Sequence, residues 1–303
     1  MVDGMPQVRV WVNGSLVDGG PSFEALDHGI TVGDGAFETA KVVDGVLFAQ
    51  DRHHDRMDRS LAGLGLPPLD RSRVQQGIDA VVGVAPMPFG RLRYTVTAGP
   101  GPLGSDRLEG SATYLVTAIE QDPPPPVATV AVVPWTRNDR GALAGLKTTS
   151  YAENVVALAA AKRLGATEAL LASTAGYLCE GTGTNVFVVL DGVVMTPSLE
   201  DGPLAGVTRG LVVEWLRAEG LEVVEDHLPM TLLNDADEVW LTSSVRDVSA
   251  VTRIEVAPSV RTLGGMPLPA PPVTPRLLGD GPGPVALLAR DVFARHQRVS
   301  MNP

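Results

Sequence analysis

The stretch from residue 146 to residue 187 constrains the fold and the chemistry of this chain most. It opens with Lys147, directly before an apolar helical pattern, and it closes with Glu180, a glycine–threonine turn and a strand-like run at 185–189. A lysine amine becomes a useful nucleophile when its surroundings lower its pKa. A lysine that binds a pyridine aldehyde also needs a partner acid at the ring nitrogen, which makes the ring an electron sink. Lys147 and Glu180 are candidates for that pair.

Composition excludes several classes of protein. The chain has 303 residues, 44% hydrophobic and 19% charged, which is enough for one large or two ordinary globular domains. The net charge of -11 argues against a nucleic-acid surface. The single cysteine, Cys179, forms no intramolecular disulfide, and the first 14 residues lack a signal pattern. With no apolar run long enough to span a bilayer, we expect a cytoplasmic protein without a membrane or nucleic-acid partner.

The first 120 residues read as strands and helices with clear turn signals. Asn13-Gly14 predicts a hairpin between strands at 8–12 and 15–17, and Asp44-Gly45 predicts another after a strand at 36–43. Gly33-Asp34-Gly35 lacks the lysine and helix start of a phosphate loop. Further patterns predict helices at 51–66 and 74–84 and strands at 90–97 and 112–119.

A proline run divides the chain. Residues 123–126 are four consecutive prolines, which form a stiff polyproline II segment without hydrogen-bond donors. We therefore expect a small N-terminal domain at 1–121, a linker at 122–127 and a larger C-terminal domain at 128–303.

The second half alternates strands and helices, which predicts a mixed sheet with a barrel-like core. In the helix expected at 151–164, Val155, Leu158, Ala159 and Ala161 are expected to face the sheet. Asp191-Gly192 predicts a hairpin, and the segment 267–284 is expected to be a surface excursion. The other expected elements are strands at 128–134, 166–171, 185–190, 193–196 and 237–244 and helices at 210–219 and 285–296.

Three motifs in order resemble one enzyme family. They read K-x-x-x-Y-A-E-N from Lys147, E-G-T-G-T-N-V-F from Glu180 and L-A-G-V-T-R from Leu204. Together they resemble the class IV, or fold type IV, pyridoxal-phosphate (PLP) enzymes, which include branched-chain and D-amino-acid aminotransferases and 4-amino-4-deoxychorismate lyase. The resemblance covers roughly residues 8–254. It implies an α+β or α/β fold of two domains, a small α/β N-terminal domain and a larger one with a barrel-like β core, and a homodimer acting on a small amino substrate.

The resemblance also assigns residues to the cofactor. Lys147 matches the catalytic lysine that holds PLP, and Glu180 matches the acid at its pyridine nitrogen. Arg56 matches the arginine that contacts the phosphate, although Arg52, Arg56 and Arg59 could instead form a solvated basic face. A helix N-terminus attracts anions, so the segment before the helix at 210–219 is either a phosphate cup or an ordinary N-cap. The cup residues implied are Gly206, Val207 and Thr208, with Ser243 and Ser244 at the end of a strand.

Four charged residues are candidates for the substrate. Glu38, or its neighbour Thr39, is expected to face the pocket unless it is a solvated strand residue. Arg93, Arg107 and Arg246 are candidates for a substrate carboxylate, with an exposed or structural role as the alternative for each. The adjacent histidines at 53–54 point in different directions on a helix, so no metal site is expected.

The branch of the family decides the reaction. The segment at 32–45 and the glycine-rich loop at 99–107 look most like the lyase, which expels the enolpyruvyl group to give 4-aminobenzoate and pyruvate for folate synthesis. An aminotransferase uses the same residues but releases a keto acid. Branched-chain enzymes carry a tyrosine five residues after the lysine, where this chain has Ala152 and places Tyr151 one residue early. A cofactor-free binding protein on the same fold is a third alternative, against which the intact Lys147, Glu180 and Arg56 argue.

Overall fold

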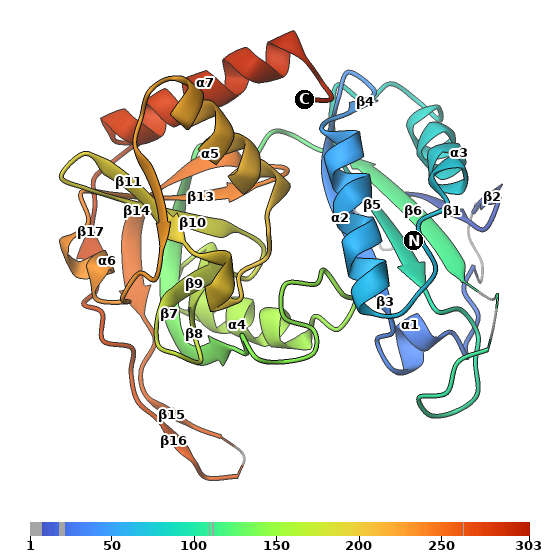
Figure 1. Ribbon diagram of the computed structural model, residues 1–303, viewed down its shortest axis with the longest axis horizontal. Coiled ribbons are helices and arrows are strands. Elements are labelled where there is room, and N and C mark those ends of the chain that lie inside the picture. The colour runs from blue at the N-terminus through green and yellow to red at the C-terminus, as the bar shows by residue number, and fades with distance from the viewer. Residues whose placement is uncertain (1–7, 18–21, 109, 111, 263) are drawn as a thin grey trace. The chain divides into compact units, whose positions relative to one another are not determined.

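The structure is a computed structural model, and it describes residues 8–17, 22–108, 110, 112–262 and 264–303 (Figure 1). It divides into two compact units. The first comprises Met1–Pro123, Leu146–Ser150 and Ser300–Pro303, and the second comprises Pro124–Gly145 and Tyr151–Val299. The boundary between Pro123 of the first unit and Pro124 of the second therefore falls inside the run of four prolines. A boundary at the linker alone would have placed residues 146–150 and 300–303 in the second domain, whereas the structure groups them with the first unit.

The first unit contains a six-stranded antiparallel sheet in the order β2-β1-β6-β5-β3-β4. The predicted hairpin of β1 (Arg9–Val12) and β2 (Ser15–Leu16) is confirmed, and Asn13 and Gly14 at its turn have φ of 46° and 107°. The second predicted hairpin is also confirmed, with Asp44 at φ 48°. The remaining strands are β3 (Gly35–Val43), β4 (Val46–Leu47), β5 (Phe89–Thr97) and β6 (Thr113–Glu120).

One face of this sheet packs against two helices, α2 (Gln50–Gly63) and α3 (Arg71–Val82) (Figure 1). Side chains alternate along each strand, so every second residue enters this core. Ala40, Leu92, Tyr94 and Val116 come from the strands, and Met57 comes from α2. The opposite face carries Phe37, Thr39, Arg91 and Arg93 instead, because these residues have the other parity. A short helix, α1 (His28–Thr31), precedes β3.

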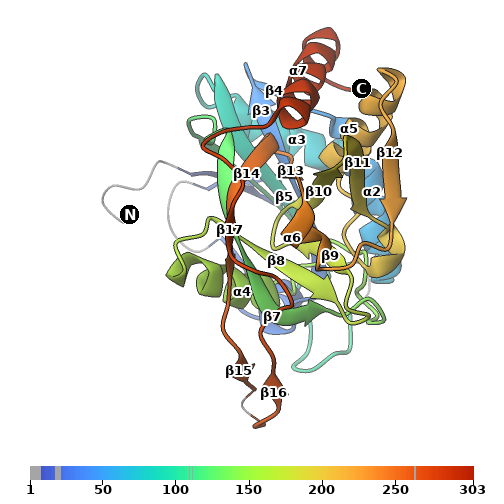
Figure 2. The same ribbon diagram turned by 90° about the vertical axis from the view of Figure 1, so that its left-hand side faces the viewer.

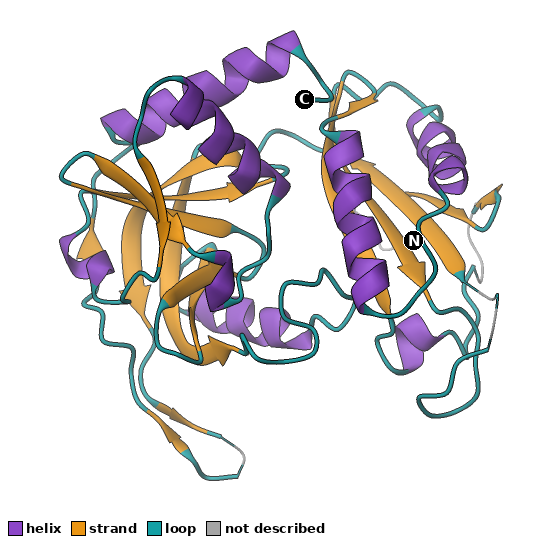
Figure 3. Ribbon diagram, in the orientation of Figure 1, coloured by secondary structure: helices purple, strands orange, loops and turns teal. Residues whose placement is uncertain are grey.

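The second unit contains a curled nine-stranded sheet of parallel and antiparallel pairs (Figure 3). Its order is β12-β11-β10-β13-β14-β7-β8-β9, with β17 paired to β14. Apolar side chains such as Val130, Leu170, Val186 and Ile254 fill its core, as expected for a barrel-like β structure. The strands are β7 (Val127–Arg137), β8 (Glu168–Ser173), β9 (Leu178–Gly181), β10 (Asn185–Leu190), β11 (Val193–Pro197), β12 (Val223–Asp226), β13 (Glu238–Ser243), β14 (Asp247–Val256) and β17 (Arg276–Leu277).

Helices surround this sheet (Figure 3). They are α4 (Ala152–Arg163), η1 (Leu199–Asp201), α5 (Val207–Ala218), α6 (Leu232–Asp235) and α7 (Pro284–Val299). A two-stranded hairpin of β15 (Val260–Arg261) and β16 (Pro267–Leu268) extends away from the rest of the second unit (Figure 2). Among the described residues, no helix combines the length and the apolarity that crossing a membrane requires.

Some details of the predicted helices were wrong. In α4 the buried residues are Asn154, Ala157, Ala160 and Ala161, while Val155 is 64% exposed. The helix is turned in this way because Asn154 makes buried hydrogen bonds, accepting from Arg137 and donating to the carbonyl of Thr182. The predicted starts of α3 at 74 and of α5 at 210 were each three residues late.

Candidate active site

Lys147 lies in a short segment that pairs with the edge of β3 in the first unit. The Phe37 N–H donates to the Lys147 carbonyl at 3.0 Å, and the Thr149 N–H donates to the Gly35 carbonyl at 2.8 Å. The Lys147 N–H in turn donates to the Ser60 hydroxyl of α2 at 3.1 Å. The position of the lysine is therefore set by main-chain bonds on a strand and by one hydroxyl on a helix.

The side chain of Lys147 approaches an aromatic ring that the sequence analysis did not single out. Its Nζ lies 4.4 Å from the centroid of the Phe37 ring, and the guanidinium carbon of Arg93 lies 3.7 Å from the same centroid. The negative face of an aromatic ring attracts cations. The ring thus holds an amine and a guanidinium close together. The strand pattern could have revealed it, because Phe37 shares its strand face with Thr39, which pairs with Arg93.

Beneath β3, on the helix side, three polar residues form a buried cluster. Arg56 binds the Glu38 carboxylate through Nε at 2.7 Å and Nη2 at 2.6 Å, and His53 Nδ1 lies 2.7 Å from the same carboxylate. Glu38 is fully buried, and only 4% of Arg56 is exposed. The alternatives of a solvated Glu38 and a solvated Arg56 were therefore wrong.

The pKa shifts in this cluster define its charges. Burial acts to raise the pKa of Glu38, but Arg56 and His53 together outweigh it and hold that pKa well below its usual range. Burial lowers the pKa of His53, and the charges of Arg56 and Lys147 act in the same direction. At neutral pH the imidazole is therefore uncharged and donates its Nδ1 proton to Glu38. The cluster amounts to one buried ion pair supported by a neutral histidine.

His53 and His54 do not act together. The His54 ring packs edge-on against Tyr94, with the ring centroids 5.6 Å apart, while His53 binds Glu38. Within the described part of the chain, no three His, Cys, Asp or Glu side chains are grouped to hold a metal ion.

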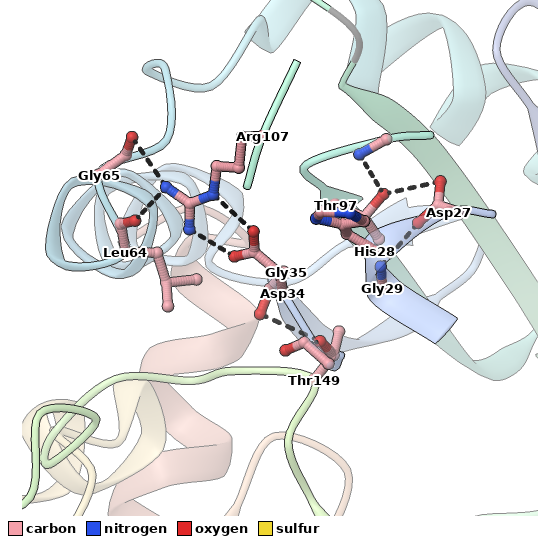
Figure 4. A network of polar contacts seen from close by, with 12 residues as sticks. Asp27, His28, Gly29, Asp34, Gly35, Leu64, Gly65, Thr97, Arg107 and Thr149 are labelled. Atoms are coloured by element: carbon pink, nitrogen blue, oxygen red, sulfur yellow. Dashed lines mark hydrogen bonds and ion pairs between the residues drawn. The ribbon is translucent and has the colours of Figure 1, made fainter. Parts of the chain in front are cut away.

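Arg107 is held by an acidic partner in the first unit (Figure 4). Its Nε and Nη2 each donate to the Asp34 carboxylate at 2.6 Å, and its Nη1 donates to the Leu64 carbonyl at 2.8 Å. These bonds to Asp34 raise the pKa of Arg107. The guanidinium fork of Arg107 is therefore engaged by a carboxylate of the chain itself.

The glycines beside Asp34 dock the lysine segment. The Gly33 carbonyl accepts from the Thr149 hydroxyl at 2.8 Å and from the Ser150 hydroxyl at 3.1 Å. Gly33 has φ of 71°, and a Cβ there would lie 2.6 Å from the Ser150 hydroxyl, so glycine suits the position. In the same network, Asp27 accepts from Thr97 and from the Gly29 N–H (Figure 4). The stretch Gly33-Asp34-Gly35 thus binds the chain segment that carries Lys147.

Glu180 lies on β9 in the second unit with 8% of its surface exposed. Its Oε1 is 3.1 Å from Arg137 Nε, and its Oε2 accepts from the Leu204 N–H at 2.9 Å. Burial and the charge of Glu180 raise the pKa of Tyr151 to about 12, and its hydroxyl donates to the Thr182 carbonyl at 2.8 Å. Glu180 is therefore oriented by a cation and a backbone donor.

The start of α5 has no capping side chain. Gly206 is its N-cap residue and offers no side-chain acceptor to the first N–H groups. Asn185 donates to the Leu204 carbonyl at 2.8 Å, and a Cβ on Gly206 would lie 2.0 Å from Asn185 Oδ1. Thr208, in the first turn, is 3% exposed. Free N–H groups and the positive end of the helix dipole suit a phosphate.

Hydroxyl side chains lie at the end of β13, and this strand pairs with the strand that begins at Asn185. Thr242 is the register partner of Asn185, and its buried hydroxyl has no hydrogen-bond partner among the described residues. Ser243 accepts from the Arg246 N–H at 3.3 Å at the turn into β14, and the half-buried Ser244 lies between these two residues. A buried, unpaired hydroxyl beside residues that shape a helix N-terminus fits a phosphate ligand.

Comparison with known proteins identifies the family of this chain. Residues 35–254 match the model of the amino-transferase class IV family. A putative branched-chain-amino-acid aminotransferase of Methanocaldococcus jannaschii is 32% identical over 82% of this chain and 88% of its own length. A bifunctional aminodeoxychorismate lyase / D-amino acid transaminase of Mycobacterium tuberculosis is 29% identical over 87% of this chain and 94% of its own.

Solved structures show the same fold. A fold IV-transaminase from Curtobacterium pusillum matches with a TM-score of 0.75 and 28% identity, covering 95% of this chain and 98% of that one. The T.th. branched-chain amino acid aminotransferase complexed with N-(5'-phosphopyridoxyl)-L-glutamate matches with a TM-score of 0.81 and 25% identity, covering 97% and 95%. The chain therefore belongs to the class IV aminotransferases, and it is a PLP-dependent enzyme, a transaminase or a lyase, of fold type IV.

Proposed function

We propose that the chain is a 4-amino-4-deoxychorismate lyase, which releases 4-aminobenzoate and pyruvate for folate synthesis. The observation that carries the proposal is the Phe37 ring, which holds Lys147 Nζ and the Arg93 guanidinium within 4.4 Å and 3.7 Å of its centroid. A base at the amine-bearing carbon and a cation for a carboxylate thus lie together. The lyase relatives and the glycine-rich loop at 99–107 support the same branch.

A second arginine favours a substrate with two carboxylates. Arg91 lies two residues before Arg93 on β5, so both emerge on the same face of the strand, about 7 Å apart along it. Both are exposed on the face that carries Phe37. Arg107 is less suited because it is bound to Asp34, and Glu38 is less suited because Arg56 and His53 surround it. Arg246 remains a weaker candidate at the turn after β13.

The catalytic roles follow from the chemistry of each side chain. When bound, PLP supplies an electron sink that acidifies the carbon bearing the substrate nitrogen. Lys147 Nζ accepts the proton from that carbon, and as an ammonium it returns a proton to the departing enolpyruvyl fragment, which becomes pyruvate. The carbon–oxygen bond breaks and the ring becomes aromatic. Glu180, which lies beside Arg137, would hold the proton on the pyridine nitrogen.

The phosphate of PLP is assigned to two kinds of group. Arg56 in the first unit supplies a guanidinium, oriented by Glu38. In the second unit, Gly206, Val207 and Thr208 supply the helix N-terminus, and Ser243 and Ser244 supply the strand end. We also propose a homodimer in the cytoplasm, as in the family that the sequence resembles.

Transamination is the second candidate, and a specific observation favours it. The relatives include enzymes named as D-alanine and branched-chain aminotransferases, and the Mycobacterium tuberculosis relative carries both activities in its name. In that reaction Lys147 would return the proton at a different carbon and a keto acid would leave. The guanidinium of Arg93 alone would then be enough to bind the carboxylate of an amino acid.

One experiment separates these alternatives. The PLP-loaded protein is given 4-amino-4-deoxychorismate, and 4-aminobenzoate is followed by its fluorescence, with Lys147→Ala and the exposed control Lys162→Ala alongside. We expect turnover that only Lys147→Ala abolishes. Absence of product from loaded enzyme would reject the lyase. A screen of D- and L-amino acids for keto-acid release would then test transamination.

A further inference from the structure

The last four residues of the chain dock onto the start of α2 within the first unit. The Ala49 N–H donates to the Met301 carbonyl at 2.7 Å, and Arg52 Nε donates to the Pro303 carbonyl at 2.9 Å. Between these two bonds lies Asn302, which is 251 positions from Asp51 in the sequence. Three successive residues of the chain end thus meet the first turn of one helix.

Asn302 makes a reciprocal pair of hydrogen bonds with Asp51. Its Oδ1 accepts from the Asp51 N–H at 3.0 Å, and its Nδ2 donates to the Asp51 carboxylate at 2.8 Å. The side chain is kept in this position by the Ser300 hydroxyl, which accepts from the Asn302 N–H at 3.1 Å. An asparagine oxygen on the second N–H of a helix is the contact that an N-cap residue makes.

The helix has no such cap of its own. Its N-cap residue is Ala49, which has no side-chain acceptor and adopts a left-handed conformation with φ of 54°. An alanine there leaves the first N–H groups without a local side-chain acceptor, so a side chain from elsewhere in the sequence can cap them. Asn302 and Met301 supply the cap from the other end of the chain.

The helix that is capped in this way carries the buried cluster. His53 and Arg56 lie in its first two turns, and both bind Glu38. Fraying of the first turn would release His53 from Glu38 and loosen the guanidinium of Arg56. We infer that Asn302 is a positioning residue, which fixes the start of α2 and through it the orientation of Arg56 toward the cofactor phosphate. This inference rests on the role proposed above for Arg56.

The test compares two ligands that differ only in the phosphate. Dissociation constants of PLP and of pyridoxal are measured by absorbance for the apo form of the full chain, its Asn302→Ala variant and a matched control, Asn234→Ala. Asn234 also accepts a backbone N–H, from Thr274, but in the second unit. We expect Asn302→Ala to weaken PLP on the order of fivefold, as loss of an N-cap does, and to leave pyridoxal within a factor of two. The control should change neither.

Two further measurements make the outcome unambiguous. Hydrogen exchange at residues 50–56 should quicken in Asn302→Ala, and Arg56→Lys, which keeps a positive charge beside Glu38, should weaken PLP but not pyridoxal. If Arg56→Lys is selective and Asn302→Ala is not, the positioning role of Asn302 is wrong while the role of Arg56 stands. If Arg56→Lys also fails to discriminate the ligands, both are wrong.

Discussion

The two regions proposed for the phosphate, one in each unit, differ in the kind of group they offer to an anion. In the first unit a charged arginine is buried, and it is accompanied by Glu38 and His53. In the second unit the start of α5 offers neutral N–H groups, shaped by the close packing of Gly206 on Asn185. A buried charge needs a partner charge and a network to orient it, whereas a helix N-terminus needs only steric room and an oriented backbone. Substitutions that change a charge should therefore disturb the first region most, and substitutions that change side-chain volume should disturb the second region most.

Removing the partner charge should have the largest effect. Glu38→Ala leaves Arg56 buried without its carboxylate, and we expect a loss of about 3–5 kcal/mol in the free energy of unfolding. Urea denaturation at pH 7 measures it. A loss below about 1 kcal/mol would show that the first region does not depend on its ion pair.

A change of volume tests the second region. In Gly206→Ala the new Cβ would lie 2.0 Å from Asn185 Oδ1, so the start of α5 or Asn185 must move. We expect a destabilisation of about 1–3 kcal/mol, as for overpacking, and weaker PLP binding. Gly210→Ala is the matched control, because nothing lies within 4 Å of its Cβ. It should stabilise α5 by about 0.5–1 kcal/mol.

Acid should act on the first region through Glu38. Its pKa is held below the ordinary value of 4.5, so ionised Glu38 contributes stability that is fully present above about pH 4.5 and is lost as the pH falls toward the folded pKa. The difference in unfolding free energy between the wild type and Glu38→Gln should therefore shrink below that pH. Chemical denaturation between pH 7 and pH 3 checks this, and a difference that grows in acid would contradict the charge assignment.

The exposed ion pair should matter least to stability. The side chain of Arg107 is 35% exposed, and we expect Arg107→Gln to cost at most about 1 kcal/mol. The KM for a carboxylate substrate should stay nearly constant in this variant.

In Arg93→Gln the KM should rise about tenfold or more, because a charged hydrogen bond to the substrate is lost. Equal KM effects in steady-state kinetics would overturn the preference for Arg93.

Local patterns predicted most of the fold. Turn pairs such as Asn13-Gly14 and Asp191-Gly192 have a conformational preference of their own, so the hairpins could be read directly. The face of α4 could not, because Asn154 is buried by bonds to Arg137 and Thr182, which are distant in the sequence. The same limit applies to the candidate site. The motifs singled out Lys147 and Glu180, but the ion pair of Arg56 with Glu38 and the shared Phe37 ring depend on strand pairing and helix packing.

The main-chain docking of Lys147 on β3 has a consequence for dividing this protein into pieces. The segment Leu146–Ser150 belongs to the first unit, although the chain on both sides of it belongs to the second. A gene cut at the proline run would therefore give a C-terminal fragment that carries the lysine without the strand edge that aligns it. The matching N-terminal fragment would present the Gly35 and Phe37 backbone groups unpaired. Reassembly from two such fragments would have to rebuild this strand pairing before any chemistry could begin, and a five-residue peptide spanning the lysine would compete with it.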